Sequence, residues 1–319
     1  MNTERPIAQW GWLNGSFVAW NEFRIHARSQ AVLVGAAVFE GIRAYWNADH
    51  EEAYFFRFGD HATRLRESMK LTRMSSSIPD QLEAICAELI VRNGWREDVH
   101  LSPFAYLDVS PDGGFLSRNP NEGFFVSAVA RPSASVVHGG AHIKVASLLR
   151  ISDATVPPRI KASANYQNSR LALMEARADG YDNALLLNQR GTVAEAADAC
   201  IAMVRRGRLV TPPVTAGILE SITRATVIEL AREHLEMPVE EREVDRSELY
   251  VADEVLLCGT GAEITPVISI DRITIGNGAP GDMTRSLQAR YFDIARGRVG
   301  EHPEWRSPVF QRAQSAALP

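Results

Sequence analysis

Lys161 lies in the segment Val156-Pro-Pro-Arg-Ile-Lys161-Ala-Ser-Ala-Asn-Tyr166, where apolar or small residues flank it directly on both sides. A lysine taken at random is a solvated surface group, and that is the alternative interpretation of this one. An ammonium group withdrawn from water loses proton affinity, and the neutral amine that results can attack a carbonyl carbon. The flanking residues therefore predict a nucleophilic lysine.

Glu195 stands in Val193-Ala-Glu195-Ala-Ala-Asp-Ala-Cys200, at the edge of a predicted strand and among small and apolar neighbours. A carboxylate in such surroundings is costly unless it is paired. One interpretation is a partly exposed glutamate at the end of a strand. The other is a carboxylate that pairs with a protonated ring nitrogen and so keeps a bound cofactor electron-poor.

Two further segments could hold a phosphate. The first is Gly217-Ile-Leu-Glu-Ser221-Ile222-Thr223-Arg224, and the second is Leu257-Cys-Gly259-Thr260-Gly261-Ala-Glu-Ile-Thr-Pro266-Val267. The first leads into a helix, whose N-terminus attracts anions through its N–H groups and dipole, and glycines let the second approach phosphate oxygens closely. Either segment alone could be an ordinary turn.

An amine, a carboxylate for the ring nitrogen and a phosphate cup are together what a pyridoxal 5'-phosphate (PLP) enzyme needs.

The elements that must position these groups are a mixture of predicted strands and helices. Asn14-Gly15 between two aromatic runs predicts a hairpin, and a second hairpin is predicted from Val38–Tyr45 to Ala53–Phe56 around a polar connection, Asn47–Glu52. Ser221 is a suitable N-cap for a helix starting near Ile222. Other helices are expected at 60–74 and 79–93, and other strands at 100–108, 123–129, 143–151, 183–187 and 199–204.

Turn-forming residues in Arg131-Pro-Ser-Ala-Ser-Val-Val-His-Gly-Gly140 predict an interdomain linker. The length of 319 residues suggests two domains, which we place at 1–130 and 143–319 with residues 131–142 between them. The polar tail beyond Glu301 is expected to be poorly ordered. The fold class predicted is mixed α/β, of the α+β type.

The overall composition limits the kinds of partner that we expect the chain to bind. With 34 basic and 39 acidic residues, the chain has no strong attraction for nucleic acid or an anionic membrane. No apolar run approaches the length of a membrane span, and Met1–Gln9 lack a signal-peptide pattern. Cys86, Cys200 and Cys258 show no metal-ligand spacing, so no metal is expected, and a reducing cytoplasm fits them best.

Seven segments, in the same order, resemble branched-chain aminotransferases of PLP fold type IV. The order of Lys161 and Glu195, 34 positions apart, is also that of fold type IV rather than of the larger aspartate-aminotransferase fold. The match runs over nearly the whole chain. Its segments are Val38-Phe-Glu-Gly-Ile-Arg43, Lys161-Ala-Ser-Ala-Asn-Tyr166, Val193-Ala-Glu195, Thr211-Pro-Pro213, Ser221-Ile-Thr-Arg224, Ala252-Asp-Glu-Val255 and Gly259-Thr-Gly-Ala-Glu-Ile-Thr-Pro-Val267.

The resemblance implies a role for each matched residue. Lys161 would carry the cofactor and shuttle the proton, Tyr166 would bond the ring hydroxyl and Glu195 the ring nitrogen. Phosphate would be bound by Arg64, Ser221, Ile222, Thr223, Gly259 and Thr260. Thr260 and Gly261 would also face the substrate carboxylate, and Phe39 would line the substrate pocket.

The chain departs from the family pattern where substrate is recognised. Val34 stands where a tyrosine is typical, and His100-Leu-Ser102 replaces a Tyr-x-Arg that would grip the substrate carboxylate. Either the local match is out of register, or Arg43 or Arg131 compensates, or specificity is altered toward an amine, a β-amino acid or a D-amino acid. Ala196-Ala-Asp-Ala-Cys200 and Gly261 are milder departures.

The resemblance implies a ping-pong transfer of an amino group from a small-molecule donor to a 2-keto acid, 2-oxoglutarate or pyruvate. Aminodeoxychorismate lyase, an enzyme of the same fold, and a non-catalytic PLP-binding protein are the competing interpretations. The Phe39–Arg43 and Thr211–Pro213 segments favour the transaminase, and the matched lysine, tyrosine, glutamate and arginine argue against loss of catalysis. A homodimer or an assembly of dimers is expected.

Overall fold

The computed structural model describes residues 8–114 and 116–315. Contacts between residues divide the chain into two compact units, and each is described by itself. The first takes in residues 1–132, 160–164 and 293–319, and the second residues 133–159 and 165–292. The bounds of the domains predicted from the sequence stay a prediction, although the predicted linker contains the short helix α4 (Ser135–Gly139) and the start of strand β8 (Ala141–Leu149).

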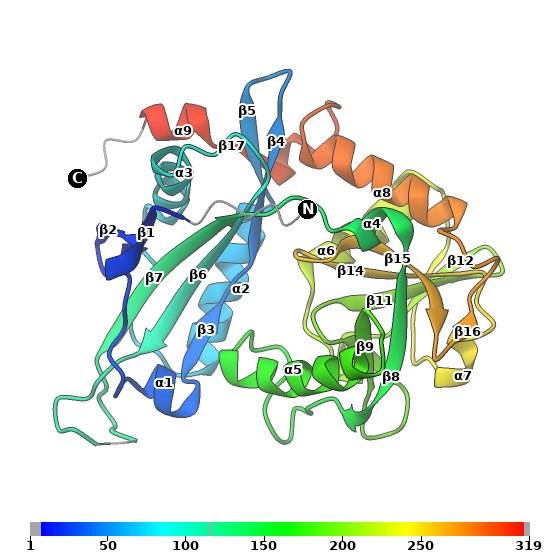
Figure 1. The fold of residues 1–319 in the computed structure, drawn as a ribbon, viewed down its shortest axis with the longest axis horizontal. Coiled ribbons are helices and arrows are strands. Elements are labelled where there is room, and N and C mark those ends of the chain that lie inside the picture. Colours follow the sequence, from blue (N-terminus) through cyan, green and yellow to red (C-terminus); the bar gives the residue numbers. More distant parts are fainter. Residues whose placement is uncertain (1–7, 115, 316–319) are drawn as a thin grey trace. The chain divides into compact units, whose positions relative to one another are not determined.

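The first unit is built on an antiparallel sheet with the strand order β17-β5-β4-β6-β7-β1-β2, in which β3 also pairs with β6 (Figure 1). The predicted Asn14-Gly15 hairpin is confirmed, since Leu13 pairs with Ser16 and Asn14 adopts a positive φ of 46°. The strands are β1 (Trp10–Leu13), β2 (Ser16–Ala19), β3 (Ala37–Phe39), β4 (Ile42–Asn47), β5 (Glu52–Phe56), β6 (Val99–Leu107), β7 (Glu122–Ala130) and β17 (Arg306–Pro308).

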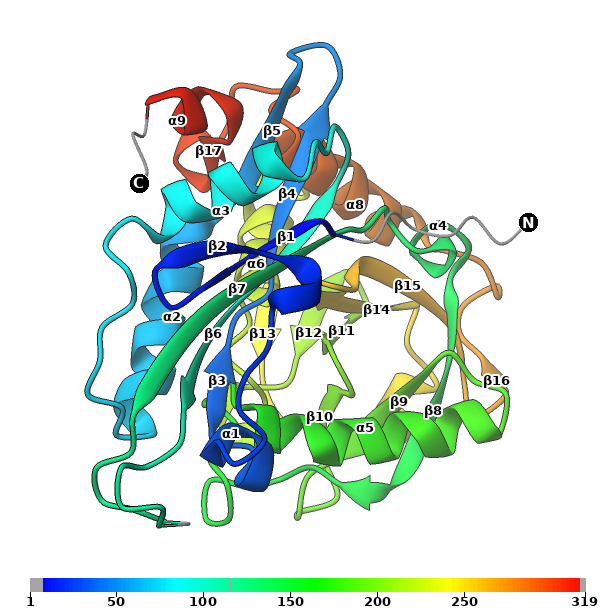
Figure 2. The ribbon, with the colours of Figure 1, turned by 60° about the vertical axis from the view of Figure 1, so that its left-hand side comes forward.

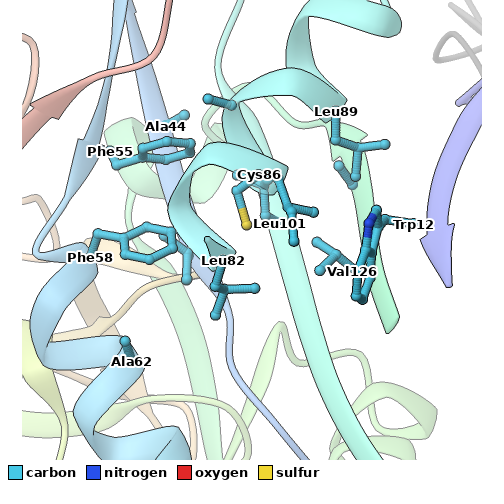
Figure 3. Packing of buried hydrophobic residues seen from close by; sticks show 14 of the residues in the cluster. Trp12, Ala44, Phe55, Phe58, Ala62, Leu82, Cys86, Leu89, Leu101 and Val126 are labelled. Atoms are coloured by element: carbon cyan, nitrogen blue, oxygen red, sulfur yellow. The ribbon is translucent and has the colours of Figure 1, made fainter. Parts of the chain in front are cut away.

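Two longer helices, α2 (Phe58–Leu71) and α3 (Leu82–Arg92), lie on one face of this sheet (Figure 2). Their apolar side chains pack on alternate residues of β6 and β7. Figure 3 shows Leu82, Cys86 and Leu89 of α3 around Leu101 and Val126 of the sheet. The shorter helical elements are α1 (Gln30–Val34), α9 (Phe310–Ser315), η1 (Trp20–Glu22) and η3 (Pro303–Trp305).

The expectation of a poorly ordered tail was wrong as far as Ser315. Residues 306–308 form β17 on the edge of the sheet against β5, and α9 follows. Trp305 is only 6% exposed and Val309 is fully buried. The polar composition of the tail concealed these two apolar residues, which attach it to the first unit.

The second unit contains a mixed sheet with the strand order β10-β9-β8-β15-β14-β11-β12-β13, and β16 pairs with β15. The β8–β9, β8–β15 and β12–β13 pairs are parallel, and the other pairs are antiparallel. With the antiparallel sheet of the first unit, this arrangement confirms the α+β class. The further strands are β9 (Asn183–Leu187), β10 (Val193–Ala196), β11 (Cys200–Arg205), β12 (Arg208–Thr211), β13 (Val239–Glu241), β14 (Glu254–Gly259), β15 (Glu263–Ile270) and β16 (Ile273–Thr274).

Helices of this part of the chain position the candidate site. Ala172 and Ala176 of α5 are fully buried against β8 and β9, so this helix packs closely on the sheet (Figure 1). The predicted helix behind Ser221 is confirmed as α6. The helices are α5 (Ser163–Ala178), α6 (Ile222–Glu233), α7 (Arg246–Leu249), α8 (Asp282–Ala295) and η2 (Val214–Ala216). Within the described residues, no helix is long and apolar enough to cross a membrane.

Candidate active site

Backbone bonds fix Lys161 on both sides in the first unit. Its N–H donates to Ser68 Oγ on α2 at 3.2 Å, and its carbonyl accepts a bond from the Phe39 N–H at 2.9 Å. Ala162 forms an isolated bridge with Val38. The Lys161 amine lies 4.8 Å from the centre of the Phe39 ring. The chain therefore presents a half-buried amine on an aromatic surface.

Arg64 is held by a buried carboxylate that the sequence had not assigned. Its Nε and Nη2 each lie 2.7 Å from a different oxygen of Glu40, and His61 Nδ1 lies 2.7 Å from the second of these oxygens. Glu40 is 0% exposed. Burial alone would raise the pKa of Glu40, but the charge of Arg64 and hydrogen bonds from Arg64 and His61 outweigh it and hold this pKa well below its usual range.

His61 completes this network as a neutral group. Burial lowers the pKa of its imidazole, and the bond to Glu40 opposes that effect only in part. A neutral imidazole that bonds a carboxylate through Nδ1 carries its proton on that nitrogen. The charge of Glu40 is thus balanced by Arg64, and one edge of the Arg64 guanidinium is fixed.

The predicted substrate residues of the first unit gather on one sheet face, apart from Val34. His100, Ser102 and Phe104 of β6 are half-buried, and they alternate with core residues of the same strand. Pairing puts Arg43 opposite His100, and Phe39 opposite Phe104. Since paired residues point to the same side of a sheet, we name this surface the His100 face. It consists of Phe39, Arg43, His100, Ser102, Phe104, Phe125, Ser127 and Val129.

Val34 is the last residue of α1 and is 39% exposed. Gly35 follows it in the left-handed conformation, with φ of 69°. A Cβ atom at Gly35 would lie 3.3 Å from that of Ala164, so this close approach also favours glycine. The geometry thus fixes the backbone after Val34 but assigns no role to its side chain.

In the second unit, Glu195 on β10 is a buried ion-pair partner. Arg150 Nη2 lies 2.6 Å from its Oε1, and both side chains are at most 7% exposed. The Leu219 N–H donates to Oε2 at 3.1 Å, and the Cys200 thiol lies 3.6 Å from the same oxygen. This outcome rules out the exposed strand-end alternative, because the carboxylate is enclosed and paired.

The two predicted phosphate segments lie at the start of helix α6 and at the end of strand β14. Ser221 caps α6, and its hydroxyl accepts a bond from the Arg224 N–H at 3.2 Å. Gly259 ends β14, where a Cβ atom would lie 3.2 Å from the Asp198 carbonyl oxygen. Thr260 and Gly261 form the turn that leads to β15. Ile222 and Thr223 are the first residues of α6, whose N–H groups have no partner within the helix.

Tyr166 lies in the first half of α5 and is half-buried. The preceding residue, Asn165, fixes this turn of the helix by donating to the Pro157 carbonyl oxygen at 3.1 Å. The second unit therefore carries Tyr166, Glu195, Ser221, Ile222, Thr223, Gly259, Thr260 and Gly261, and the first unit carries the remaining predicted site residues.

Sequence reasoning missed four residues of these networks: Glu40, His61, Arg150 and Cys200. Glu40 lay within a segment quoted for its resemblance, and His61 precedes Arg64 by three positions on the same helix face. These signals could have suggested an ion pair. Arg150 reaches Glu195 through the pairing of β8, β9 and β10, which local sequence does not disclose. Cys200 follows Glu195 by five positions, after the short turn that ends β10, and this proximity in the chain could have suggested the contact.

Comparisons with known proteins place this chain among enzymes. The model of the amino-transferase class IV family matches residues 37–270. A probable branched-chain-amino-acid aminotransferase of Aquifex aeolicus is 38% identical over 93% of this chain and 96% of its own length. The branched-chain-amino-acid aminotransferase of Salmonella typhimurium is 35% identical over 95% of this chain and 98% of its own length.

Solved structures agree with these relatives. The branched-chain amino acid aminotransferase of Thermobaculum terrenum, determined in its PLP form, has a TM-score of 0.88 and 44% identity, covering 96% of this chain and 99% of that one. The Escherichia coli enzyme has a TM-score of 0.90 and 33% identity, covering 95% of this chain and all of that one. The chain therefore belongs to the class IV aminotransferases.

Proposed function

We propose that this chain is a PLP-dependent aminotransferase of the branched-chain type, which moves an amino group between an amino acid and a 2-keto acid. The observation that supports it most directly is the placement of Lys161. The sequence contains three lysines, and the other two are Lys70 and Lys144. Lys70 is exposed at the end of α2. Hydrogen bonds from Lys144 to Asp179 and Glu175 raise its pKa, so that amine stays protonated and unreactive.

The residues present fit PLP. A protonated ring nitrogen needs a carboxylate that stays ionised without bulk water, and the buried pair of Glu195 with Arg150 meets that need. A phosphate needs N–H donors, which the Ser221-capped start of α6 offers, and the turn after Gly259 is proposed to contribute further backbone N–H groups. Among the predicted cofactor residues, Arg64 adds a positive charge whose orientation Glu40 fixes.

When bound, PLP supplies a carbonyl carbon that takes up the amino group and a ring that accepts electrons. Lys161 is proposed to hold the cofactor and to move a proton with its Nζ, which requires a neutral amine. The Lys161 Nζ lies 4.8 Å from the centre of the Phe39 ring, so this ring forms part of its surroundings. Arg150 keeps Glu195 charged, and Tyr166 is proposed to bond the ring hydroxyl. Ser221, Ile222, Thr223, Gly259, Thr260 and Arg64 are proposed to bind the phosphate.

Borohydride trapping tests this assignment. Purified protein supplied with PLP should turn yellow, and reduction followed by peptide mass mapping should locate one pyridoxyl group on Lys161. Lys161→Ala should give no trapped group, whereas Lys70→Ala and Lys144→Ala should behave like the parent. A colourless protein, or a group trapped at Lys70 or Lys144, would contradict the proposal.

For the substrates, we propose a branched-chain amino acid as donor and 2-oxoglutarate or pyruvate as acceptor. Altered specificity stays a second candidate, because His100 and Ser102 occupy the β6 positions where the family pattern has Tyr-x-Arg. Rates with leucine, isoleucine, D-alanine, a β-amino acid and (R)-1-phenylethylamine separate the two. Release of pyruvate from aminodeoxychorismate without an amino acceptor would instead favour the lyase.

We further propose that the chain forms a homodimer or an assembly of dimers and works in the cytoplasm. Its three cysteines are unpaired and buried, which suits a reducing compartment. Light scattering of the purified holoenzyme measures the assembly, and a molecular mass of one chain would contradict it. Fractionation of cells that express the chain tests its location.

A further inference from the structure

The kind of side chain on the His100 face changes from one end of its strands to the other. At one end lie three rings in a stack, with centroid distances of 4.8 Å from Phe39 to Phe104 and 4.7 Å from Phe104 to Phe125. Ser102 and Ser127 pair in the next row. Arg43, His100 and Val129 form the row after that, on three neighbouring strands. The face thus runs from aromatic through small and polar to cationic.

Arg131 extends the cationic end. Its N–H donates to the Asp98 carbonyl oxygen at 2.7 Å, which continues the β6–β7 ladder by one residue. Alternation along the strand then puts the Arg131 side chain on the same face as Val129 and His100. Arg43 fixes this residue further, because its Nη1 donates to the Arg131 carbonyl oxygen at 2.5 Å.

The imidazole of His100 points from its own row, which includes Arg43, toward the row of Ser102 and Ser127. Its Cε1 lies 2.9 Å from where a Cβ atom of Gly41 would be, so only glycine leaves room for this orientation. Burial lowers the pKa of His100 to about 3, and the charges of Arg131, Arg43 and Lys161 act in the same direction. His100 is therefore neutral at neutral pH.

We propose that Arg131, held in place by Arg43, and His100 together bind a carboxylate group of the substrate. This inference rests on the proposed function and selects among its substrates: the chain would act on amino acids and keto acids rather than on amines without a carboxylate. Arg131 supplies the charge and a forked donor, which suits a carboxylate. His100 supplies one neutral ring N–H, and its buried Nδ1 has no hydrogen-bond partner within residues 8–114 and 116–315.

Two buried acids of the first unit, Asp98 and Glu40, are engaged by other groups. Asp98 precedes β6, but Arg296 engages its two oxygens at 2.8 and 2.6 Å. Glu40 is likewise engaged by Arg64 and His61. Ser102 takes the position of the arginine in the family pattern, so this chain would have moved the charge from β6 to the end of β7.

The test measures inhibition of the holoenzyme by 4-methylvalerate and by its uncharged isostere, 4-methylpentanamide. Arg131→Gln should weaken binding of the carboxylate roughly tenfold or more, as expected for a lost hydrogen bond to a charged group, and should leave the amide unchanged. Arg131→Lys should restore much of the difference. Arg66→Gln, which replaces an exposed arginine of α2, is the matched control and should match the parent.

The yellow colour and the trapped pyridoxyl group of each variant are recorded first. If the parent protein binds PLP and transaminates, but Arg131→Gln binds both inhibitors as the parent does, the carboxylate subsite is refuted and the proposed function stands. Equal weakening of both inhibitors also refutes the subsite, because Arg131 would then not distinguish the charged carboxylate from the uncharged amide. If the parent itself neither binds PLP nor transaminates, the proposed function fails, and this inference fails with it.

Discussion

Glu40 and Arg64 form a two-point ion pair in the first unit, in which Nε and Nη2 of the arginine each lie 2.7 Å from a separate carboxylate oxygen. The carboxylate is fully buried, and His61 bonds it from the same helix as Arg64. The Glu40 N–H meanwhile donates to the Pro103 carbonyl oxygen at 2.9 Å, beside the Phe39 N–H that bonds Lys161. One residue therefore supports both the proposed phosphate arginine and the segment next to the proposed catalytic lysine.

Glu40→Gln tests that double role. It keeps the shape of the side chain but leaves the buried Arg64 charge uncompensated, so we expect a loss of about 3–5 kcal/mol in the free energy of unfolding. PLP affinity should also fall, because Arg64 would lose its fixed orientation. Chemical unfolding and fluorescence titration with PLP measure the two effects.

A surface pair gives the matched control. Glu88 and Arg92 lie 2.7 Å apart on α3, with side chains 22% and 35% exposed. Glu88→Gln should change the free energy of unfolding by less than about 1 kcal/mol and leave PLP affinity unaltered. Similar effects of the Glu40 and Glu88 substitutions would mean that the buried network has no special role.

A double-mutant cycle on Arg150 and Glu195 examines the charge balance of the second unit. Arg150→Met leaves a buried carboxylate and Glu195→Leu leaves a buried guanidinium, so each should cost about 3–5 kcal/mol in the free energy of unfolding. The double variant leaves neither charge and should cost less than the sum, by at least about 1 kcal/mol. Urea unfolding of the four apoproteins gives the coupling, and additive costs would show that the two groups do not depend on each other.

Ser221 is predicted to stabilise α6 even without a bound phosphate. Its hydroxyl caps the helix by accepting from the Arg224 N–H, so Ser221→Ala in the apoprotein should lose about 1 kcal/mol. Asp245 holds the same position before α7 but makes no side-chain cap bond. Asp245→Ala should therefore lie within about 0.5 kcal/mol of the parent. Equal losses would remove the reason for treating Ser221 as a cap.

Local sequence predicted individual helices and strands better than it predicted the buried ion pairs. The Asn14-Gly15 hairpin and the Ser221-capped helix follow from residues adjacent in the chain, and both were confirmed. The pairing of Glu40 with Arg64 joins residues 24 positions apart, and that of Arg150 with Glu195 is longer still. Such contacts depend on how helix α2 packs in the first case and on how strands pair in the second, and a single sequence leaves both open. The family resemblance located candidate residues but not what holds them.

His100 gives a pH dependence of known sign. Its pKa is about 3 in the folded chain against an ordinary 6.5, so between these values the unfolded chain binds a proton that the folded chain does not. The contribution of His100 to the free energy of unfolding is thus fully present above pH 6.5 and is lost as the pH falls toward 3. His100→Gln should lower the slope of unfolding free energy against pH by up to about 1.4 kcal/mol per pH unit in this window. Unfolding series from pH 4.5 to 6.5 with equal slopes would contradict the shift.

The tail beyond Glu301 should contribute to stability despite its polar composition. Trp305 packs edge-on against Phe56 at 6.0 Å, and its carbonyl oxygen accepts from the Arg57 N–H at 2.6 Å. Farther along, the Glu52 carboxylate accepts from the Phe310 N–H at 2.7 Å, where α9 begins. Trp305→Ala would remove a 94%-buried ring, since the residue is 6% exposed, and should cost about 3–5 kcal/mol.

Gln314→Ala is the control for that substitution, because Gln314 is an exposed residue of α9. It should stay within about 0.5 kcal/mol of the parent. Limited proteolysis adds a local measurement: cleavage after Arg306 and Arg312 should accelerate in Trp305→Ala and not in Gln314→Ala. If both variants were cleaved at the rate of the parent, β17 and α9 would owe little to Trp305, and the order of the tail would rest instead on the bonds to Glu52.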